Sequence, residues 1–532
     1  MVAVLALAAA LRVWGLAFGL PHNLTRPDEE AVQNIAMRVL RSRSLDPGFF
    51  DWPSLFIYAV TVLLVIYFNL GRATGRFTSE GSFTRAAEAD PTAVHLLARG
   101  LSALAGVLTV VSVYRVGTSL FGRTAALLSS LYLAVAALHV RDAHFGMVDI
   151  TAVYLLMQSF LLTVQATRDG TRRHLLLSAL MAGLAAATKY NAGLIVLPGL
   201  VAILSGHVPA VRARRLRSAA EFGCVAGLAF VVGMPYALLD LPAFIEGLQR
   251  ISAHLRDGHA AFAGYGWQVH LTSSLRYGLG LPMLAAGLTG LALHARQGWR
   301  EGLLLLSFPV TYYALVGSGQ TTFARYVLPV VPFLCLGAGY ATTVLAAGVA
   351  HLIRRPTVVY ALTTVFAIAC AAPSAWSAVR TDLLLGRADS RLIAAAWIRG
   401  RFADGVSIHQ SGSVYTQVQM QRVDPPNAPR YPRRFLDEAA DTFVDAQHSP
   451  APSPDIIVVS DCGLVYCNVA DRLRRLLATD YRLEHTVIAQ DRAAPGLVYD
   501  RDDAFLVPLA GFDAVTRPGP NLSIYVRRTD PR

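Results

Sequence analysis

The sequence predicts a polytopic α-helical membrane protein that ends in a small extracytoplasmic α/β domain. Of its 532 residues, 54% are hydrophobic and only 15% are charged, and the mean hydropathy is +0.44. These values are too apolar for a soluble chain of this length. Apolar runs of about 20 residues, the length that crosses a bilayer, recur as far as residue 375. After residue 376 the apolar runs shorten to strand length, so we expect a membrane domain over 1–375 and an α/β domain over 376–532.

We expect about eleven crossings, the first of them a retained helix. Arg12 interrupts the apolar core of the first run and no small-residue cleavage site follows, which argues against a cleaved signal peptide. The expected crossings are 1–20, 94–117, 124–140, 148–166, 174–189, 191–205, 218–238, 273–293, 302–318, 326–348 and 357–375.

Basic residues in alternate loops predict the orientation of these crossings, because cytoplasmic loops are enriched in Lys and Arg. Segments 21–53 and 141–149 and everything after residue 376 then lie outside the cytoplasm. The apolar run 54–71 has both ends outside, so we interpret it as a re-entrant or surface-lying juxtamembrane helix. An external N-terminus is the alternative. The basic residues of the cytoplasmic loops are Arg168, Arg172, Arg173, Arg212, Arg214, Arg215, Arg217, Arg296, Arg300, Arg354 and Arg355.

The C-terminal domain has strand-length apolar runs that alternate with helical patterns. It contains no Gly-rich phosphate loop, nucleophile elbow or four-cysteine zinc pattern. We expect strands at 456–460 and 521–526, helices at 390–401 and 471–478, and a polar, proline-rich loop at 424–454.

The distribution of charge and the positions of the cysteines indicate which classes of binding partner to expect. The formal net charge is +12, but the basic residues lie in short loops and form no basic face of the kind that nucleic acid requires, so no nucleic-acid partner is expected. Cys462 and Cys467 form a disulfide if their region is extracytoplasmic. Two ligands at this spacing make half a metal site, so metal binding by this pair is disfavoured.

Two polar segments beside the expected crossings suggest chemistry at the membrane surface: residues 26–30, with Asp28 and Glu29, and residues 139–149. Ionised groups near hydrocarbon are costly unless they are paired or wetted. A carboxylate held there can act as general base on an acceptor hydroxyl or amine, which then displaces a phosphate leaving group. That leaving group needs positive charge or a metal. Candidates for this charge are Arg141, His144, Lys189 or a divalent cation held by Asp28, Glu29, His144 or Asp149.

Each of these residues also has a structural interpretation. Acids after a proline are typical of a helix N-terminus, where they oppose the macrodipole. Arg141 can anchor a helix at the interface, His144 can be a structural histidine, and Lys189 can extend to the membrane surface. Asp149 is harder to explain in this way, because it lies inside an apolar run and needs a partner.

The order of several short motifs is specific. In sequence they are RVWGL (12–16), PDE (27–29), WPSLFIY (52–58), ARGLSAL (98–104), LFGR (120–123), RDAHFGMVD (141–149), ATKYN (187–191), GH (258–259), RYVLPVVP (325–332), DSR (389–391) and AWI (396–398). This ordered set resembles the GT-C superfamily of integral membrane glycosyltransferases, in particular the protein O-mannosyltransferase-like branch. That branch, glycosyltransferase family 39, includes the aminoarabinose transferases.

The resemblance implies a GT-C fold and transfer of a hexose or pentose from a polyprenyl-phosphate-linked donor to an acceptor at the extracytoplasmic face of the cell membrane. The acceptor, whether protein, lipid or glycan, stays open. Asp28 would be the general base, with Glu29 beside it and Asp149 as the acid of the second loop. Arg141, Lys189 and Arg325 would face the donor phosphate, and a divalent metal ion would be a possible cofactor. The large β-trefoil insertion of the eukaryotic mannosyltransferases is not identifiable, which disfavours protein O-mannosylation of that type.

The alternatives are a transporter or flippase of lipid-linked sugars and a non-catalytic scaffold. The chain shows neither internal repeats nor paired broken helices, which argues against a transporter.

Overall fold

The computed structural model describes residues 1–259, 264–420 and 431–528, and the chain forms two compact units. The helical unit consists of Met1–Trp14, Ala31–Tyr67 and Leu97–Asp382, and the mixed unit of Gly15–Glu30, Phe68–Leu96 and Leu383–Arg532. Two N-terminal segments therefore share a compact unit with the C-terminal residues, an arrangement that the sequence did not indicate.

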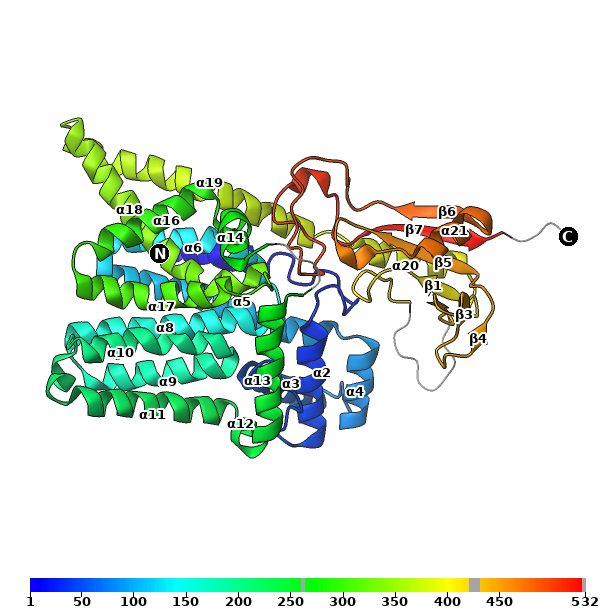
Figure 1. The fold of residues 1–532 in the computed structure, drawn as a ribbon, viewed down its shortest axis with the longest axis horizontal. Helices are drawn as coiled ribbons and strands as arrows, with labels where there is room; N and C mark the ends of the chain where they lie inside the picture. Colours follow the sequence, from blue (N-terminus) through cyan, green and yellow to red (C-terminus); the bar gives the residue numbers. More distant parts are fainter. Residues whose placement is uncertain (260–263, 421–430, 529–532) are drawn as a thin grey trace. The chain divides into compact units, whose positions relative to one another are not determined.

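The helices follow the apolar runs of the sequence (Figure 1). Their bounds are α1 (Val2–Val13), α2 (Glu29–Ser42), α3 (Leu55–Ala73), α4 (Glu80–Ala89), α5 (Thr92–Phe121), α6 (Arg123–Val135), α7 (Ala137–Asp142), α8 (Val148–Asp169), α9 (Arg172–Thr188), α10 (Val196–Leu204), α11 (Arg215–Gly233), α12 (Tyr236–Leu239), α13 (Leu241–Asp257), α14 (Gly266–Val269), α15 (Arg276–Leu279), α16 (Leu281–Ala295), α17 (Trp299–Gly317), α18 (Val331–Leu352) and α19 (Val359–Leu385). Short 3₁₀ turns at Tyr190–Ile195 and Ala324–Val330 precede α10 and α18.

Among the described residues, six helices are long and apolar enough to cross a membrane. These are Leu55–Ala73, Thr92–Phe121, Val148–Asp169, Pro209–Gly233, Ala324–Leu352 and Pro356–Arg401. Helices α1 and α6 and the stretch Tyr190–Leu204 are apolar but shorter. The number of crossings, eleven, therefore stays a prediction.

The expected crossing 273–293 is not one straight helix but is either a broken span or a re-entrant loop. The chain bends by 110° between Gly266–Leu279 and Leu281–Ala295. Gly280, at the break, has φ +77°, a left-handed conformation that glycine adopts without steric cost, and Pro282 begins the next helix. Hydropathy alone does not reveal such a bend, because both halves are apolar.

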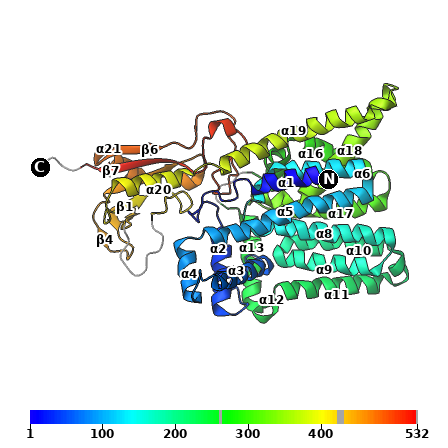
Figure 2. The same cartoon turned by 180° about the vertical axis from the view of Figure 1, so that it is seen from behind.

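Helix α3 runs in a different direction from the main group of parallel-lying helices, called the bundle below. Helices α8, α9, α10, α11 and α17 run side by side, whereas α13 crosses their direction and α3 is seen nearly end-on (Figures 1 and 2). One face of α3, with Phe56, Val60 and Leu64, is buried, while Val62 on another face is 57% exposed. A helix that is apolar on its exposed face as well needs lipid there. This arrangement supports the interpretation of 54–71 as a juxtamembrane helix.

The mixed unit contains a four-stranded sheet of order β1-β5-β7-β6, in which β1 and β5 are parallel and the other pairs antiparallel. Side chains alternate across β5, so Ile456 and Val458 pack against α20 (Ser390–Arg401), whereas Ile457 packs against α21 (Asp471–Thr479). The strands are β1 (Ile408–Gln410), β5 (Ile456–Asp461), β6 (Tyr481–Val487) and β7 (Asn521–Arg527).

The segment expected to be a polar loop holds a second, three-stranded sheet. Its strands are β2 (Phe435–Asp437), β3 (Thr442–Val444) and β4 (Pro450–Ala451). Strands of two or three residues are too short for alternation to be recognised in a sequence. The first part of the expected loop, 424–430, lies outside the described residues.

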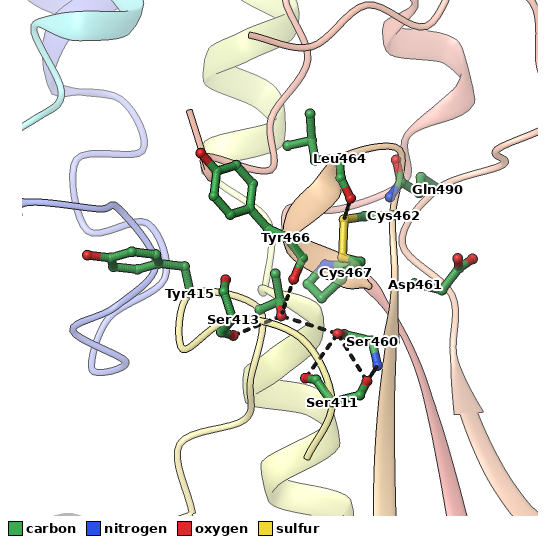
Figure 3. Close-up of a disulfide and its surroundings, with 12 residues drawn as sticks. Ser411, Ser413, Tyr415, Ser460, Asp461, Cys462, Leu464, Tyr466, Cys467 and Gln490 are labelled. Carbon is green, nitrogen blue, oxygen red and sulfur yellow. Dashed lines mark hydrogen bonds between the residues drawn. A yellow bond between two sulfur atoms is a disulfide. The ribbon is translucent and has the colours of Figure 1, made fainter. Parts of the chain in front are cut away.

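The disulfide that the sequence allowed is present between Cys462 and Cys467 (Figure 3). It closes the turn that follows β5 and packs against Tyr499 and Leu506.

Candidate functional site

The acid turn, residues 26–30, joins a loop of the mixed unit to the start of α2. Asp28 has φ +73°, a left-handed conformation that few non-glycine residues adopt and that Asp and Asn tolerate best. Its neighbours Arg26, Pro27 and Glu29 are buried, whereas Asp28 is only half-buried. The backbone thus places the half-buried carboxylate of Asp28 between two buried neighbours.

A buried ion pair holds the first residue of this turn. Arg26 Nη1 lies 2.8 Å from Asp503 Oδ1, and both side chains are almost inaccessible to solvent. The guanidinium also lies over the ring of Phe505, 5.6 Å from its centroid. Because removing one partner of a buried pair leaves an uncompensated charge, this contact fixes the turn strongly.

The last residue of the acid turn is bonded to the C-terminal domain. Tyr415 donates its hydroxyl proton to Glu30 Oε1 at 2.9 Å, and Glu30 Oε2 has no hydrogen-bond partner among the described residues. Burial raises the pKa of Glu30, as do the negative charges of Asp28 and Glu29, while the bond from Tyr415 opposes this rise. Burial, with Glu30 as a second cause, also raises the pKa of Tyr415.

Two further contacts attach the preceding loop to residues 411–419. His22 Nε2 donates to the carbonyl oxygen of Gln417 at 2.9 Å, and the amide of Gln419 donates to Asn23 Oδ1 at 3.0 Å. His22 Nδ1 accepts from the backbone N–H of Leu24, which requires a neutral ring. Burial, assisted by the charge of Arg391, lowers the pKa of His22 to about 4, so the ring is neutral at pH 7.

In the helical unit the structure brings together two of the expected site residues. Lys189 Nζ lies 2.5 Å from Asp149 Oδ1, in the first turn of α8, and 5.2 Å from the centroid of the Tyr326 ring. The buried Asp149 therefore has the partner that its position required, and the ammonium of Lys189 is balanced by that carboxylate.

The two arginines expected at the donor phosphate have separate surroundings. Arg141, in α7, is buried, 4.0 Å from Asp142 and 5.7 Å from the Phe145 ring centroid. Arg325 is half-buried, and its guanidinium carbon lies 3.9 Å from the ring centroid of Phe323. The 3₁₀ turn that holds Arg325 packs against α7 and α8, the elements of Arg141 and Asp149.

His144 is not available as a metal ligand. Its Nδ1 and Nε2 lie 2.9 and 2.8 Å from the carbonyl oxygens of Val140 and Trp14. Asp149 is paired with Lys189, and no cluster of three or more His, Cys, Asp or Glu side chains among the described residues can hold a metal ion. The donor set expected for a divalent cation does not fit this arrangement, so no chemical step is assigned to one.

Most contacts of the buried Arg12 guanidinium are with the backbone. Its guanidinium donates to the carbonyl oxygens of Ala8, Leu133 and Ala134 at 3.0 to 3.1 Å and lies 3.0 Å from His139 Nδ1. Carbonyl oxygens in the last turn of α6 thus solvate a charge inside the apolar unit.

Sequence reasoning missed the partners of the acid turn. Asp503 and Tyr415 lie 477 and 385 residues away along the chain. The acidic run at 500–503, between two apolar stretches of the C-terminal domain, was the one available signal.

Comparison with known proteins agrees with this architecture. Residues 94–239 match the sequence family dolichyl-phosphate-mannose-protein mannosyltransferase. ArnT from Cupriavidus metallidurans, solved with undecaprenyl phosphate, is 16% identical and superposes over 98% of this chain and 97% of its own with a TM-score of 0.54. The chain has the GT-C fold. The family match over residues 94–239 and the shared fold agree with the resemblance to the protein O-mannosyltransferase-like branch of the GT-C superfamily.

A second GT-C structure is larger than this chain. The oligosaccharyltransferase AglB from Archaeoglobus fulgidus, solved with an inhibitory peptide and a dolichol-phosphate, is 15% identical with a TM-score of 0.51. The match covers 75% of this chain and 58% of AglB, so the chain spans a little over half of that protein's length. No curated protein sequence matches the chain significantly.

Proposed function

We propose that this GT-C protein transfers a sugar from a polyprenyl-phosphate donor to an acceptor at the extracytoplasmic membrane face, with Asp28 as general base. Asp28 takes the proton of the acceptor hydroxyl or amine, and the acceptor atom attacks the anomeric carbon. The bond from that carbon to the phosphate oxygen breaks, and polyprenyl phosphate leaves with the electron pair. The solved ArnT and AglB complexes, which contain a polyprenyl phosphate, support this class of donor.

The conformation of Asp28 is the observation on which the proposal depends. A non-glycine residue in the left-handed region costs of the order of 1 kcal/mol or more and persists only where its surroundings determine it. Here a buried ion pair at Arg26 and a hydrogen bond at Glu30 flank it on both sides. Such strain clusters at catalytic residues, and the carboxylate of Asp28 is only half-buried, so an acceptor can reach it.

The charge that the leaving phosphate requires comes, in this proposal, from Arg141, Lys189 and Arg325. Lys189 and Asp149 form an ion pair, so Asp149 orients Lys189. The extracytoplasmic location is supported by the disulfide between Cys462 and Cys467, because such bonds persist in oxidising compartments.

Substitution of Asp28 by Asn tests the base. Asn keeps the shape and tolerates the left-handed conformation but cannot accept a proton, so transfer should fall by about 10² to 10⁴-fold while the fold is retained. The measurement is release of polyprenyl phosphate and sugar transfer from a radiolabelled polyprenyl-phosphate sugar.

The matched control is Asp46→Asn, in the segment between α2 and α3. The Asp46 carboxylate accepts the backbone N–H of Gly48, a bond that an amide oxygen preserves. Retention of more than about a tenth of wild-type turnover in Asp28→Asn would remove Asp28 as the base. Movement of intact donor across the membrane without bond cleavage would instead favour the flippase.

A further inference from the structure

The turn that the disulfide closes contacts the 411–419 loop. The N–H of Ser413 donates to the carbonyl oxygen of Tyr466 at 2.8 Å, and Thr416 Oγ1 donates to the same oxygen at 3.4 Å. Gly412 has φ +75°, and a Cβ there would lie 2.8 Å from this oxygen. Only glycine permits such an approach, so the two loops are closely fitted.

The same turn contacts the acidic 499–506 loop. The hydroxyl of Tyr466 donates to the carbonyl oxygen of Asp502 at 2.6 Å, and the disulfide packs against Tyr499 and Leu506. This second loop provides Asp503, which pairs with Arg26, and Phe505, whose ring lies 5.7 Å from that of Phe18.

Tyr415 is fixed at its backbone as well as at its hydroxyl. Its carbonyl oxygen accepts from Arg391 Nη1, and the buried guanidinium of Arg391 is held by both oxygens of Asp389 at 2.8 and 2.6 Å. The side chain projects toward the N-terminal ribbon in Figure 3, where its hydroxyl donates to Glu30. Because Tyr415 is bonded both to Arg391 and to Glu30, a displacement of the 411–419 loop would also displace the acid turn.

We propose that the disulfide-closed turn and the two loops that it contacts form a clamp on the acid turn, in which Tyr415 is a positioning residue for Glu30 and Asp28. The left-handed conformation of Asp28 persists only if the surrounding structure fixes the backbone on both sides of it. The clamp does so, because it holds Arg26 by an ion pair and Glu30 by a hydrogen bond. The disulfide restricts the conformational freedom of the turn that contacts both loops of the clamp. The effect on turnover rests on the proposed function, whereas the structural effect does not.

Hydrogen exchange of the full-length protein in detergent tests the clamp without any turnover. The double variant Cys462→Ser/Cys467→Ser should exchange faster than wild type at residues 22–30 and 411–419, while α9 is unchanged. The control is Cys224→Ser, which removes an exposed free thiol of α11. Unchanged exchange at 22–30 in the double variant would overturn the clamp.

Kinetics of Tyr415→Phe test the positioning role. Loss of a hydrogen bond to a charged group should lower kcat about tenfold and leave KM for the donor nearly unchanged, because Tyr415 does not touch the donor in this proposal. The bond favours ionised Glu30, which faces the negative charges of Asp28 and Glu29. Its loss should therefore raise the pKa of Glu30 further, and because Glu30 lies two residues from Asp28, the acidic limb of the kcat profile should differ from that of wild type.

The control for Tyr415→Phe is Tyr360→Phe, because Tyr360 is 78% exposed on α19. A kcat and a pH profile equal to those of wild type would exclude Tyr415 as a positioning residue. Inactivity of Asp28→Asn together with an unaffected Tyr415→Phe would leave the proposed base in place and remove only the clamp.

Discussion

Asp28 illustrates what a sequence reveals about a single residue and what it does not. Its place after an apolar helix made it one of several acids that could act at the membrane surface, and the resemblance to the GT-C superfamily implied that it is the base. The ion pair of Arg26 and the hydrogen bond to Glu30 involve residues that lie 477 and 385 positions away along the chain. No local pattern encodes such contacts, because they form only when the C-terminal domain packs on residues 15–30.

The arginines in the helical unit permit a prediction at the same scale. Arg325 presents a planar fork of donors stacked on Phe323, and a lysine reproduces the charge but neither the fork nor the stacking. Arg325→Lys should therefore raise KM for the polyprenyl-phosphate sugar several-fold, as measured by initial rates at varied donor concentration.

Arg296→Lys is the matched control for this substitution. Arg296 is exposed at the end of α16, in a loop expected to be cytoplasmic, where positive charge alone is required. Equal kinetics for the two variants would exclude Arg325 from the donor site and leave Arg141 and Lys189 as the cationic partners.

Among the elements, those with a strong periodic pattern were predictable. The helix expected at 390–401 is α20 with the same bounds, and the strands expected at 456–460 and 521–526 are β5 and β7. The bend at Gly280 and the sheet of β2, β3 and β4 were not predicted. The bend was missed because the apolar run continues on both sides of Gly280. The sheet was missed because strands of two or three residues are too short to show the alternation of polar and apolar residues.

The packing of α16 on α18 leads to a prediction at the scale of elements. A Cβ at Gly290 would overlap the carbonyl oxygen of Gly337, so the two helices touch through their backbones. Gly290→Ala should destabilise the protein by about 1 to 3 kcal/mol, since the helices must separate. Thermal unfolding in detergent, followed by tryptophan fluorescence, measures this effect.

Gly348→Ala is the control for the helix contact. Gly348 lies in α18 with no atom within 4 Å of a Cβ built there, so alanine should be neutral or stabilise the helix by up to about 1 kcal/mol. A Gly290→Ala protein as stable as wild type would show that α16 and α18 are not packed through Gly290.

At the scale of the whole molecule, the chain combines apolar helices with a C-terminal sheet domain that the N-terminal loop 15–30 joins. Hydropathy was sufficient to predict the membrane class, and the shortening of apolar runs was sufficient to predict the sheet domain. Which segments belong to which unit was not predictable, because this depends on contacts such as those of His22 and Asn23 with residues 411–419.

Topology provides the last prediction, which concerns the helix α3. By composition this helix can cross a membrane, but it lies across the bundle, and the basic loops predict that both of its ends are outside. In a Cys224→Ser/Cys370→Ser background, Ser42→Cys and Thr78→Cys flank α3 at exposed positions. Both should react with an impermeant maleimide applied to intact cells.

Two further positions serve as controls for labelling from outside and from the cytoplasm. Thr479→Cys, exposed at the end of α21, should react from outside, whereas Thr357→Cys, exposed between α18 and α19, should react only after permeabilisation. Reaction at residue 42 or 78 alone would show that α3 crosses the bilayer. The basic loops would still place the C-terminal domain outside the cytoplasm. They would no longer place the acid turn there, because one more crossing would separate it from those loops.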